Sequence, residues 1–327
     1  MEALIRLPVG IAAVVFSALL FTNALEWLGH RLHLGQAALG SVFAAMGTAL
    51  PEASIAFLAA VAPGTGGGGQ AVSVGAVLGA PLLLATLGFA VLGLGTYRAG
   101  HRELTVPQGT VRRDLVCYLV AFGSAAGAGI VGLEPLLRLV LALVLLVGYG
   151  VYVWRTVGAS GGRDAARDAP PRLWLARRRA EPPLAAILIQ LVLAVALMLL
   201  GARLFVSVLT GVAADLALSG FVLAVLIAPL ATELPETVNS VLWIAQDKDA
   251  LAAGNVIGAM VLQGAVVPAV GLAFTAWHFD GTEAVAAGVA LVGALIPLAG
   301  LGVFRRLPAW LLLIPAVLYV AFVIWVL

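Results

Sequence analysis

The segment TALPE at residues 48–52 recurs as TELPE at residues 232–236, in each case inside a long apolar run. Proline and glutamate are both costly within a membrane span, because proline removes a backbone hydrogen-bond donor and a charged carboxylate loses its hydration. The glutamates of the two segments, Glu52 and Glu236, lie 184 positions apart (236 minus 52). The recurrence of this costly pair indicates one site built by two related halves of the chain.

The composition is that of a polytopic membrane protein. Of the 327 residues, 62% are hydrophobic and only 10% are charged, and the mean hydropathy is +1.10. A water-soluble domain could not cover its surface with so few charges. The alternating pattern of barrel strands is absent, and the 38 glycines favour close packing of helices. The single cysteine, Cys117, excludes an internal disulfide and a thiolate metal cage.

The sequence predicts an all-α membrane protein with ten transmembrane helices. Several apolar runs exceed the ~20 residues needed to cross a bilayer. The runs are 8–28, 35–62, 70–96, 115–132, 135–157, 184–214, 217–245, 250–276, 284–303 and 308–327. The two Pro-Glu motifs fall in the second run of each group of five. We therefore expect a first five-helix repeat at 1–157, a cytoplasmic linker at 158–183 and a second repeat at 184–327.

Basic residues are divided unevenly between the two sets of loops. Of the 18 lysines and arginines, all but Arg6, Arg138 and Arg203 fall on one side of the expected spans. The positive-inside rule then makes the odd-numbered loops cytoplasmic and places both termini outside the inner or plasma membrane. Five spans per half is an odd number, so the halves would be inverted, as in many secondary transporters. We interpret the arginine-rich linker as a topology anchor, with a regulatory or lipid-binding linker as the alternative.

Three of the 16 acids, Glu52, Glu233 and Glu236, lie well inside spans, and all three belong to the repeated motif. A carboxylate at this depth is a functional-site candidate by default. The alternative, that these acids only bond neighbouring helices, suits a lone glutamate better than a duplicated Pro-Glu pair. The motif therefore predicts a site in which both halves contribute an acid.

The prolines of the motif would add oxygen ligands to these acids. Pro51 and Pro235 each loosen the carbonyl four residues earlier, and neighbouring carbonyls, including those of Thr48 and Thr232, can turn inward. Carboxylate and carbonyl oxygens suit Ca²⁺, and two carboxylates neutralise one divalent ion. Without that ion, two close carboxylates in a low dielectric would take up protons or monovalent cations. Such competition is a sufficient basis for antiport.

A second repeated stretch follows each motif. GAVLGA at residues 75–80 corresponds to GNVIGA at 254–259, and the glycines permit close approach of a neighbouring helix. Asn255 and Gln263 are polar residues in this part of the second half. Gln263 either faces the site or makes a hydrogen bond between helices.

Together these motifs resemble the cation/Ca²⁺ exchanger superfamily, which includes the sodium/calcium exchangers. Its two α-repeats pair a G-T-S-L-P-E helix with a G-N-x-x-G-S-N helix, and here the first of these reads GTALPE in one half and ATELPE in the other. The resemblance implies that Glu52 and Glu236 are the central carboxylates. It also implies that Thr48 and Thr232 complete a Ca²⁺ site with their carbonyls, and that sliding of spans one and six switches access.

The chain departs from this pattern where the family has further polar residues. The departures are Ala49, Glu233, Ala80, Ala259, Leu84 and Gln263. Those positions resemble Na⁺ ligands of the family, so the resemblance implies a retained divalent site and fewer Na⁺ ligands. Glu233 lies three residues before Glu236 and could bind a proton beside the site, or could line a water-filled vestibule.

The sequence favours an antiporter that exports a cation in exchange for H⁺ or Na⁺, and the oxygen ligands favour Ca²⁺ as that cation. Asn255, Gln263 and Glu233 are the candidates for coupling to the counter-ion. A Na⁺/H⁺ exchanger on the same fold is the first alternative, and a cation channel with a ring of acids is the second. No His-Glu-x-x-His or Gly-x-Ser-x-Gly motif indicates an enzyme. The expected partners are inorganic cations and the bilayer, without nucleic acid or a cofactor, and a monomer would suffice.

Overall fold

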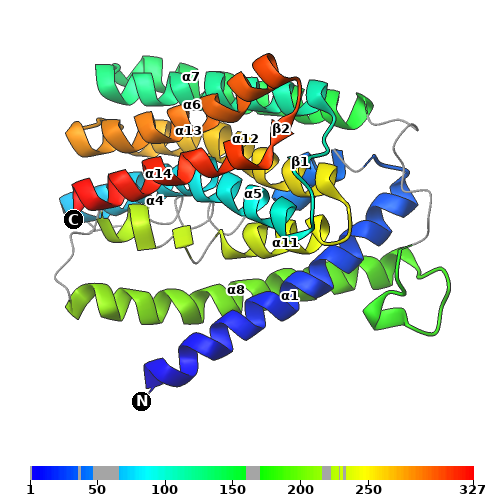
Figure 1. The fold of residues 1–327 in the computed structure, drawn as a ribbon. Helices are drawn as coiled ribbons and strands as arrows, with labels where there is room; N and C mark the ends of the chain where they lie inside the picture. The colour runs from blue at the N-terminus through cyan, green and yellow to red at the C-terminus, as the bar shows by residue number, and fades with distance from the viewer. Residues whose placement is uncertain are drawn as a thin grey trace.

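The computed structural model describes residues 2–35, 38–46, 66–159, 170–215, 222–227, 229–230 and 233–327. In these residues the chain is almost entirely helical (Figure 1). The elements of the first half are α1 (Glu2–Leu32), the π-helix η1 (Leu39–Ala44), α4 (Gly66–Leu83), the π-helix η2 (Leu84–Gly88), α5 (Phe89–Arg98), β1 (Glu103–Leu104), α6 (Gln108–Val131) and α7 (Pro135–Ala159). The later elements are the 3₁₀ turn η3 (Trp174–Ala176), α8 (Leu184–Asp215), the π-helix η4 (Leu223–Ile227), α11 (Leu234–Ile244), α12 (Asp249–Phe274), α13 (Gly281–Phe304), β2 (Leu307–Pro308) and α14 (Ala309–Val326).

The described helices overlap the spans expected from hydropathy, with ends that differ by several residues. Seven helices in the described part of the chain are long and apolar enough to cross a membrane. The second and seventh expected spans are described only in part, at 38–46 and between 222 and 244, and those parts are also largely helical. Helices are the expected solution in lipid, because each backbone group must find its hydrogen-bond partner within the segment.

The helix α12 occupies the centre of the fold. It is mostly buried along its whole length, whereas α7 leaves most of its apolar surface exposed. Exposed leucines and valines on α7 suit contact with lipid chains. The only strands in the described residues are β1, between α5 and α6, and β2, between α13 and α14, which pair as a two-residue antiparallel ladder.

The helix α12 of the second half and the segment α4–η2–α5 of the first half each pack on helices of the opposite half. α12 contacts α6, α7 and η1, while α4, η2 and α5 together contact α13, α14 and η4. Two glycines at these contacts, one in each half, lie against backbone of the other half. A Cβ atom on Gly258 would lie 2.3 Å from the backbone oxygen of Ser41, and one on Gly79 would lie 2.7 Å from that of Val225. The two halves therefore interlock through backbone contacts that tolerate no side chain at these glycines.

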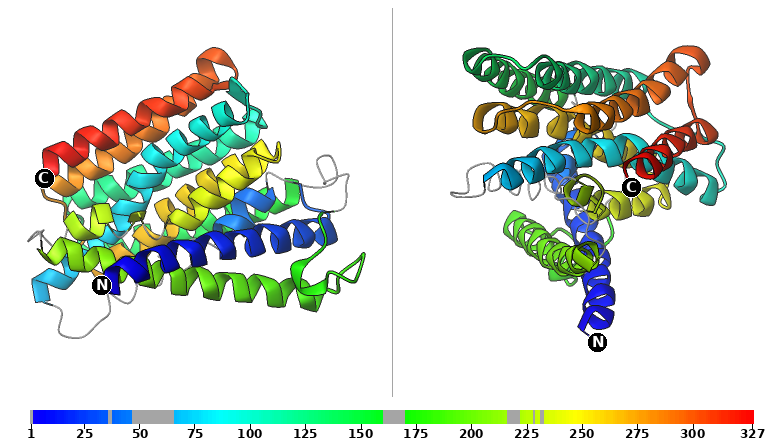
Figure 2. Two further views of the ribbon diagram at one scale, coloured as in Figure 1. Left: turned by 60° about the horizontal axis from the view of Figure 1, so that its bottom comes forward. Right: turned by 90° about the vertical axis from the view of Figure 1, so that its left-hand side faces the viewer.

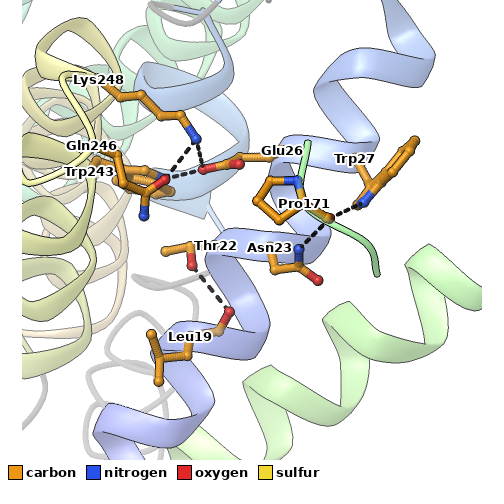
Figure 3. Close-up of polar contacts among 9 residues, drawn as sticks. All are labelled: Leu19, Thr22, Asn23, Glu26, Trp27, Pro171, Trp243, Gln246 and Lys248. Carbon is orange, nitrogen blue, oxygen red and sulfur yellow. Dashed lines mark hydrogen bonds and ion pairs between the residues drawn. The ribbon is translucent and has the colours of Figure 1, made fainter. Parts of the chain in front are cut away.

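The helices α1 and α8 form a pair that stands apart from the other helices (Figures 1 and 2). The described linker residues 170–183 bind this pair. Asn23 Nδ2 and Trp27 Nε1 of α1 both donate to the carbonyl of Pro171, at 3.0 and 2.9 Å (Figure 3). Gln190 Nε2 of α8 donates to the carbonyl of Leu20 at 3.0 Å. Because the linker and both helices share these bonds, they form one structural unit.

A partly buried ion pair joins this unit to the rest of the molecule. Lys248 Nζ, in the turn between α11 and α12, lies 2.5 Å from Glu26 Oε1 of α1, and Trp243 Nε1 donates to the same oxygen at 3.2 Å (Figure 3). We expect Lys248→Met to lower the free energy of unfolding by about 1–3 kcal/mol, because it leaves the Glu26 carboxylate without its counter-charge. Thermal unfolding of the purified protein in detergent measures this loss.

The double variant Glu26→Gln/Lys248→Met should recover most of the lost stability, because it removes both charges together. The control is the exposed ion pair between Arg306 and Glu103, whose side-chain atoms lie 3.1 Å apart. Arg306→Met should change the unfolding temperature little, since water screens an exposed pair. Equal losses from Lys248→Met and Arg306→Met would contradict this account.

Candidate functional site

The second Pro-Glu motif forms the beginning of helix α11. Glu233 is the N-cap residue, and its backbone N–H donates to the carbonyl of Pro229 at 2.9 Å. Helix α11 begins at Leu234 with Pro235 in its first turn, and the predicted loosening of the Ala231 carbonyl stays a prediction. The first turn tolerates proline because an N–H at that position has no helical acceptor. Ala231 and Thr232 lie outside the described residues.

This helix start favours negative charge. Glu236 lies in the first turn of α11, where the aligned peptide dipoles leave a partial positive charge. The side chains of Glu233 and Glu236 are fully buried within the protein. An acid in a membrane span that faces the protein interior rather than lipid marks an ion or proton site by default. Both side chains lie inside the molecule, and their predicted role in binding a cation stays a prediction.

Glu233 is held by the central helix. Gln263 Nε2 of α12 donates to Glu233 Oε1 at 2.8 Å, and both side chains are buried. This is the interhelical hydrogen bond that the sequence left as one alternative for Gln263, and its partner is one of the motif acids. The Gln263 amide thus fixes the position of the Glu233 carboxylate beside the start of α11.

Asn255 binds the backbone of the motif helix. Its Nδ2 donates to the backbone carbonyl of Glu236 at 3.1 Å and to Ser240 Oγ at 3.2 Å. Ser240 Oγ in turn donates to the carbonyl of Ala252 on α12 at 3.3 Å. These bonds fix the register of α11 on α12, so Asn255 positions Glu236 through its backbone rather than through its carboxylate.

The first Pro-Glu motif, including Thr48, Pro51 and Glu52, lies outside the described residues. The segment that leads into it is the π-helix η1, just as η4 precedes the second motif. π-Helical turns are rare and occur frequently at functional sites. The described residues contain no group of three or more His, Cys, Asp or Glu side chains that could hold a metal. Because Glu52 lies outside the described residues, its predicted pairing with Glu236 stays a prediction.

Two buried polar residues were not predicted from the sequence. Asp114 was assigned to a span end, yet in α6 it is only 1% exposed, lies 2.7 Å from Arg113 Nη2 and accepts a 2.9 Å hydrogen bond from Ser41 Oγ of η1. Asn239 lies one helical turn beyond Glu236 and is fully buried. The only sequence signals were the adjacent Arg-Asp pair and the three-residue spacing from Glu236.

Comparisons with known proteins agree with this architecture. The family described as "Sodium/calcium exchanger protein" matches residues 3–158 and 186–327. The putative antiporter CaxA of Alkalimonas amylolytica is 24% identical over 295 residues, which cover 86% of this chain and 84% of that protein.

Solved structures of the sodium-calcium exchanger NCX_Mj share the fold. With 2.5 mM Na⁺ and 0.1 mM Ca²⁺ the TM-score is 0.75 at 20% identity, over 99% of this chain and 98% of that one. With 10 mM Na⁺ and no Ca²⁺ it is 0.74 at 22% identity, over 98% of each chain. The family match spans both halves of the chain and omits only the linker and the first residues. The chain therefore belongs to the sodium/calcium exchanger protein family, a family of multi-pass membrane antiporters that exchange cations.

Proposed function

We propose that this protein exports Ca²⁺ in exchange for H⁺ or Na⁺ by alternating access to a site that contains Glu236 and Glu52. The observation that carries this proposal is the fully buried Glu236 carboxylate at the start of α11, within a motif that the first half repeats. The carbonyls of Thr48 and Thr232 would complete the Ca²⁺ ligands. Carboxylate and carbonyl oxygens are the ligands that Ca²⁺ prefers in proteins.

The proposed site requires two inverted five-helix repeats, at 1–157 and 184–327, joined by the linker 158–183. The reciprocal glycine contacts support this arrangement. Gly258 packs on Ser41, and Gly79 packs on Val225. Ser41 and Val225 differ by 184 positions, as the two motif glutamates do, and Gly79 and Gly258 differ by 179, as Gly75 and Gly254 do. Such pairwise correspondence is expected if a pseudo-two-fold axis relates the repeats. Ten spans would then place both termini outside the inner or plasma membrane.

Obligatory exchange follows from the charge of the proposed site. Two carboxylates that face each other in a low dielectric cannot both remain charged without a cation. The protein would therefore switch the site from one side of the membrane to the other only when the site holds Ca²⁺ or the H⁺ or Na⁺ that replaces it. No chemical step is involved, and inorganic cations are the only partners that the proposal needs.

Glu233 is the proposed proton-binding group. Its carboxylate adds a third acid to the site. The neutral Gln263 amide donates to this carboxylate and adds no negative charge of its own. We expect Glu233→Gln to flatten the dependence of exchange on pH. We expect the same variant to change the Ca²⁺ affinity less than about threefold, or ~0.7 kcal/mol. Ca²⁺ uptake into proteoliposomes over a series of pH values measures both quantities. An unchanged pH profile would assign Glu233 a passive role.

Flux through the purified protein under separate H⁺ and Na⁺ gradients tests the proposed function, with Ca²⁺, Mg²⁺ and Mn²⁺ compared as substrates. Uphill accumulation of Ca²⁺ driven by either gradient supports antiport and excludes a channel. Ca²⁺ flux that ignores both gradients would contradict the proposal. Exchange of Na⁺ for H⁺ without any Ca²⁺ flux would favour the monovalent exchanger instead.

A further inference from the structure

Asn239 is a fully buried amide with no hydrogen-bond partner for either side-chain atom among the residues that the structure describes. Asn255 on α12 differs, since its Nδ2 donates to the Glu236 carbonyl and to Ser240 Oγ of α11. Native proteins rarely bury a polar group without a partner, least of all within a membrane. Where they do, water or an ion commonly supplies the missing bonds.

The helical spacing places Asn239 at the interface between α11 and α1. Trp243 lies four residues after Asn239 and therefore on the same face of α11. The Trp243 indole donates to Glu26, so this face is turned toward α1. Glu236 lies three residues before Asn239, so Asn239 stands between the motif acid and the Lys248 end of α11.

The facing side of α1 is also polar. Thr22 lies one turn before Glu26 and is buried, and within the described part of the chain its hydroxyl donates only to the carbonyl of Leu19, at 3.2 Å. Figure 3 shows Thr22 and Glu26 on the side of α1 nearer Trp243, whereas Asn23 and Trp27 extend toward the linker. Figure 1 shows α1 and α11 running toward the same end of the molecule.

We propose that Asn239 and Thr22 line the route along which hydrated cations pass between Glu236 and the Lys248 end of the molecule. This inference rests on the proposed cation exchange at Glu236. The Asn239 amide oxygen and the Thr22 hydroxyl replace part of the hydration shell of the passing ion, which is the kind of oxygen ligand that Ca²⁺ accepts. At the Lys248 end of this route, the Lys248 ammonium occupies the position beside Glu26 that an arriving cation would take. The Lys248–Glu26 ion pair therefore closes this end of the route in the present conformation.

Cysteine accessibility tests the route without measuring transport. Cys117 is the only cysteine, so Cys117→Ser gives a cysteine-free background. We expect Asn239→Cys and Thr22→Cys to react with a membrane-impermeant thiol reagent added on the Lys248 side, which is the predicted cytoplasmic side. Added Ca²⁺ should slow both reactions, because the ion and the reagent compete for one passage.

Ser240→Cys is the matched control. Ser240 is as buried as Asn239 and adjacent to it, but its hydroxyl donates to Ala252 on α12. We expect no reaction at this position. Equal reaction at positions 239 and 240, or no reaction at 239 from the Lys248 side, would overturn the inference.

The Asn239→Leu variant tests the same route through transport. The half-saturating Ca²⁺ concentration on the Lys248 side should rise by about tenfold, the value expected for loss of one oxygen ligand. The value on the opposite side should stay unchanged, and thermal stability should not fall, because the variant removes a buried amide that lacks partners. The conservative Asn239→Ser variant should keep most of the wild-type affinity. Wild-type exchange with unchanged Asn239→Leu kinetics would overturn this inference alone, whereas absent wild-type exchange would overturn the proposed function.

Discussion

The Glu236→Gln variant is expected to lose Ca²⁺ exchange by more than about 100-fold, which corresponds to ~2.7 kcal/mol. The amide removes one of the two negative charges that the proposed site presents to a divalent ion, and it cannot bind a proton in exchange. Folding should survive, because a buried neutral amide is easier to accommodate than a buried carboxylate. Gradient-driven Ca²⁺ uptake in proteoliposomes measures the loss, and thermal unfolding in detergent measures the stability.

Glu103→Gln is the control for this variant. Glu103 lies in β1, and about half of its side-chain surface is exposed. Glu103→Gln changes the net charge by the same amount as Glu236→Gln but leaves α11 unaltered, so exchange should stay at the wild-type rate. Glu52→Gln should fail as Glu236→Gln does, because Glu52 is its counterpart in the first half. A Glu236→Gln protein that transports normally would place the cation site elsewhere.

The positions of the helices could be predicted because lipid leaves the backbone few alternatives. The ends were less predictable. The first apolar run was expected at 8–28, but α1 extends from Glu2 to Leu32 and so includes the polar residues His30 and Arg31. Hydropathy marks the part of a helix that lies in lipid, whereas helical hydrogen bonding continues into the interface.

Within the site, the sequence could identify the acids but not their partners. The burial of Glu233 and Glu236 follows from their place in an apolar run. The bond from Gln263 to Glu233 depends on how α12 packs against α11, and no local pattern determines that contact. Asp114 illustrates the same limit, because the residue that it binds, Ser41, lies 73 positions away in η1. Hydropathy alone therefore placed Asp114 at the end of a span, without a partner.

The Gly258→Ala variant should destabilise the protein by about 1–3 kcal/mol, the usual effect of overpacking a tight contact. The new methyl carbon would lie 2.3 Å from the backbone oxygen of Ser41, and a backbone atom cannot rotate away as a flexible side chain can. The π-helix η1 would have to move away from α12. Because η1 leads directly into the Thr48–Glu52 segment, we expect exchange to fall by about tenfold or more, or ~1.4 kcal/mol. Thermal unfolding and Ca²⁺ uptake measure the two effects.

Gly288→Ala is the matched control, because Gly288 lies in α13 with no atom within 4 Å of the added carbon. That variant should keep its activity and gain up to about 1 kcal/mol, since alanine favours a helix over glycine. If the halves are inverted repeats, Gly79→Ala should reproduce the Gly258→Ala loss, because its methyl carbon meets Val225 just before the second motif. A Gly258→Ala protein with normal stability and rate would show that the contact between α12 and η1 does not position the site. A loss in Gly258→Ala without one in Gly79→Ala would instead mean that the two halves support the site by different contacts.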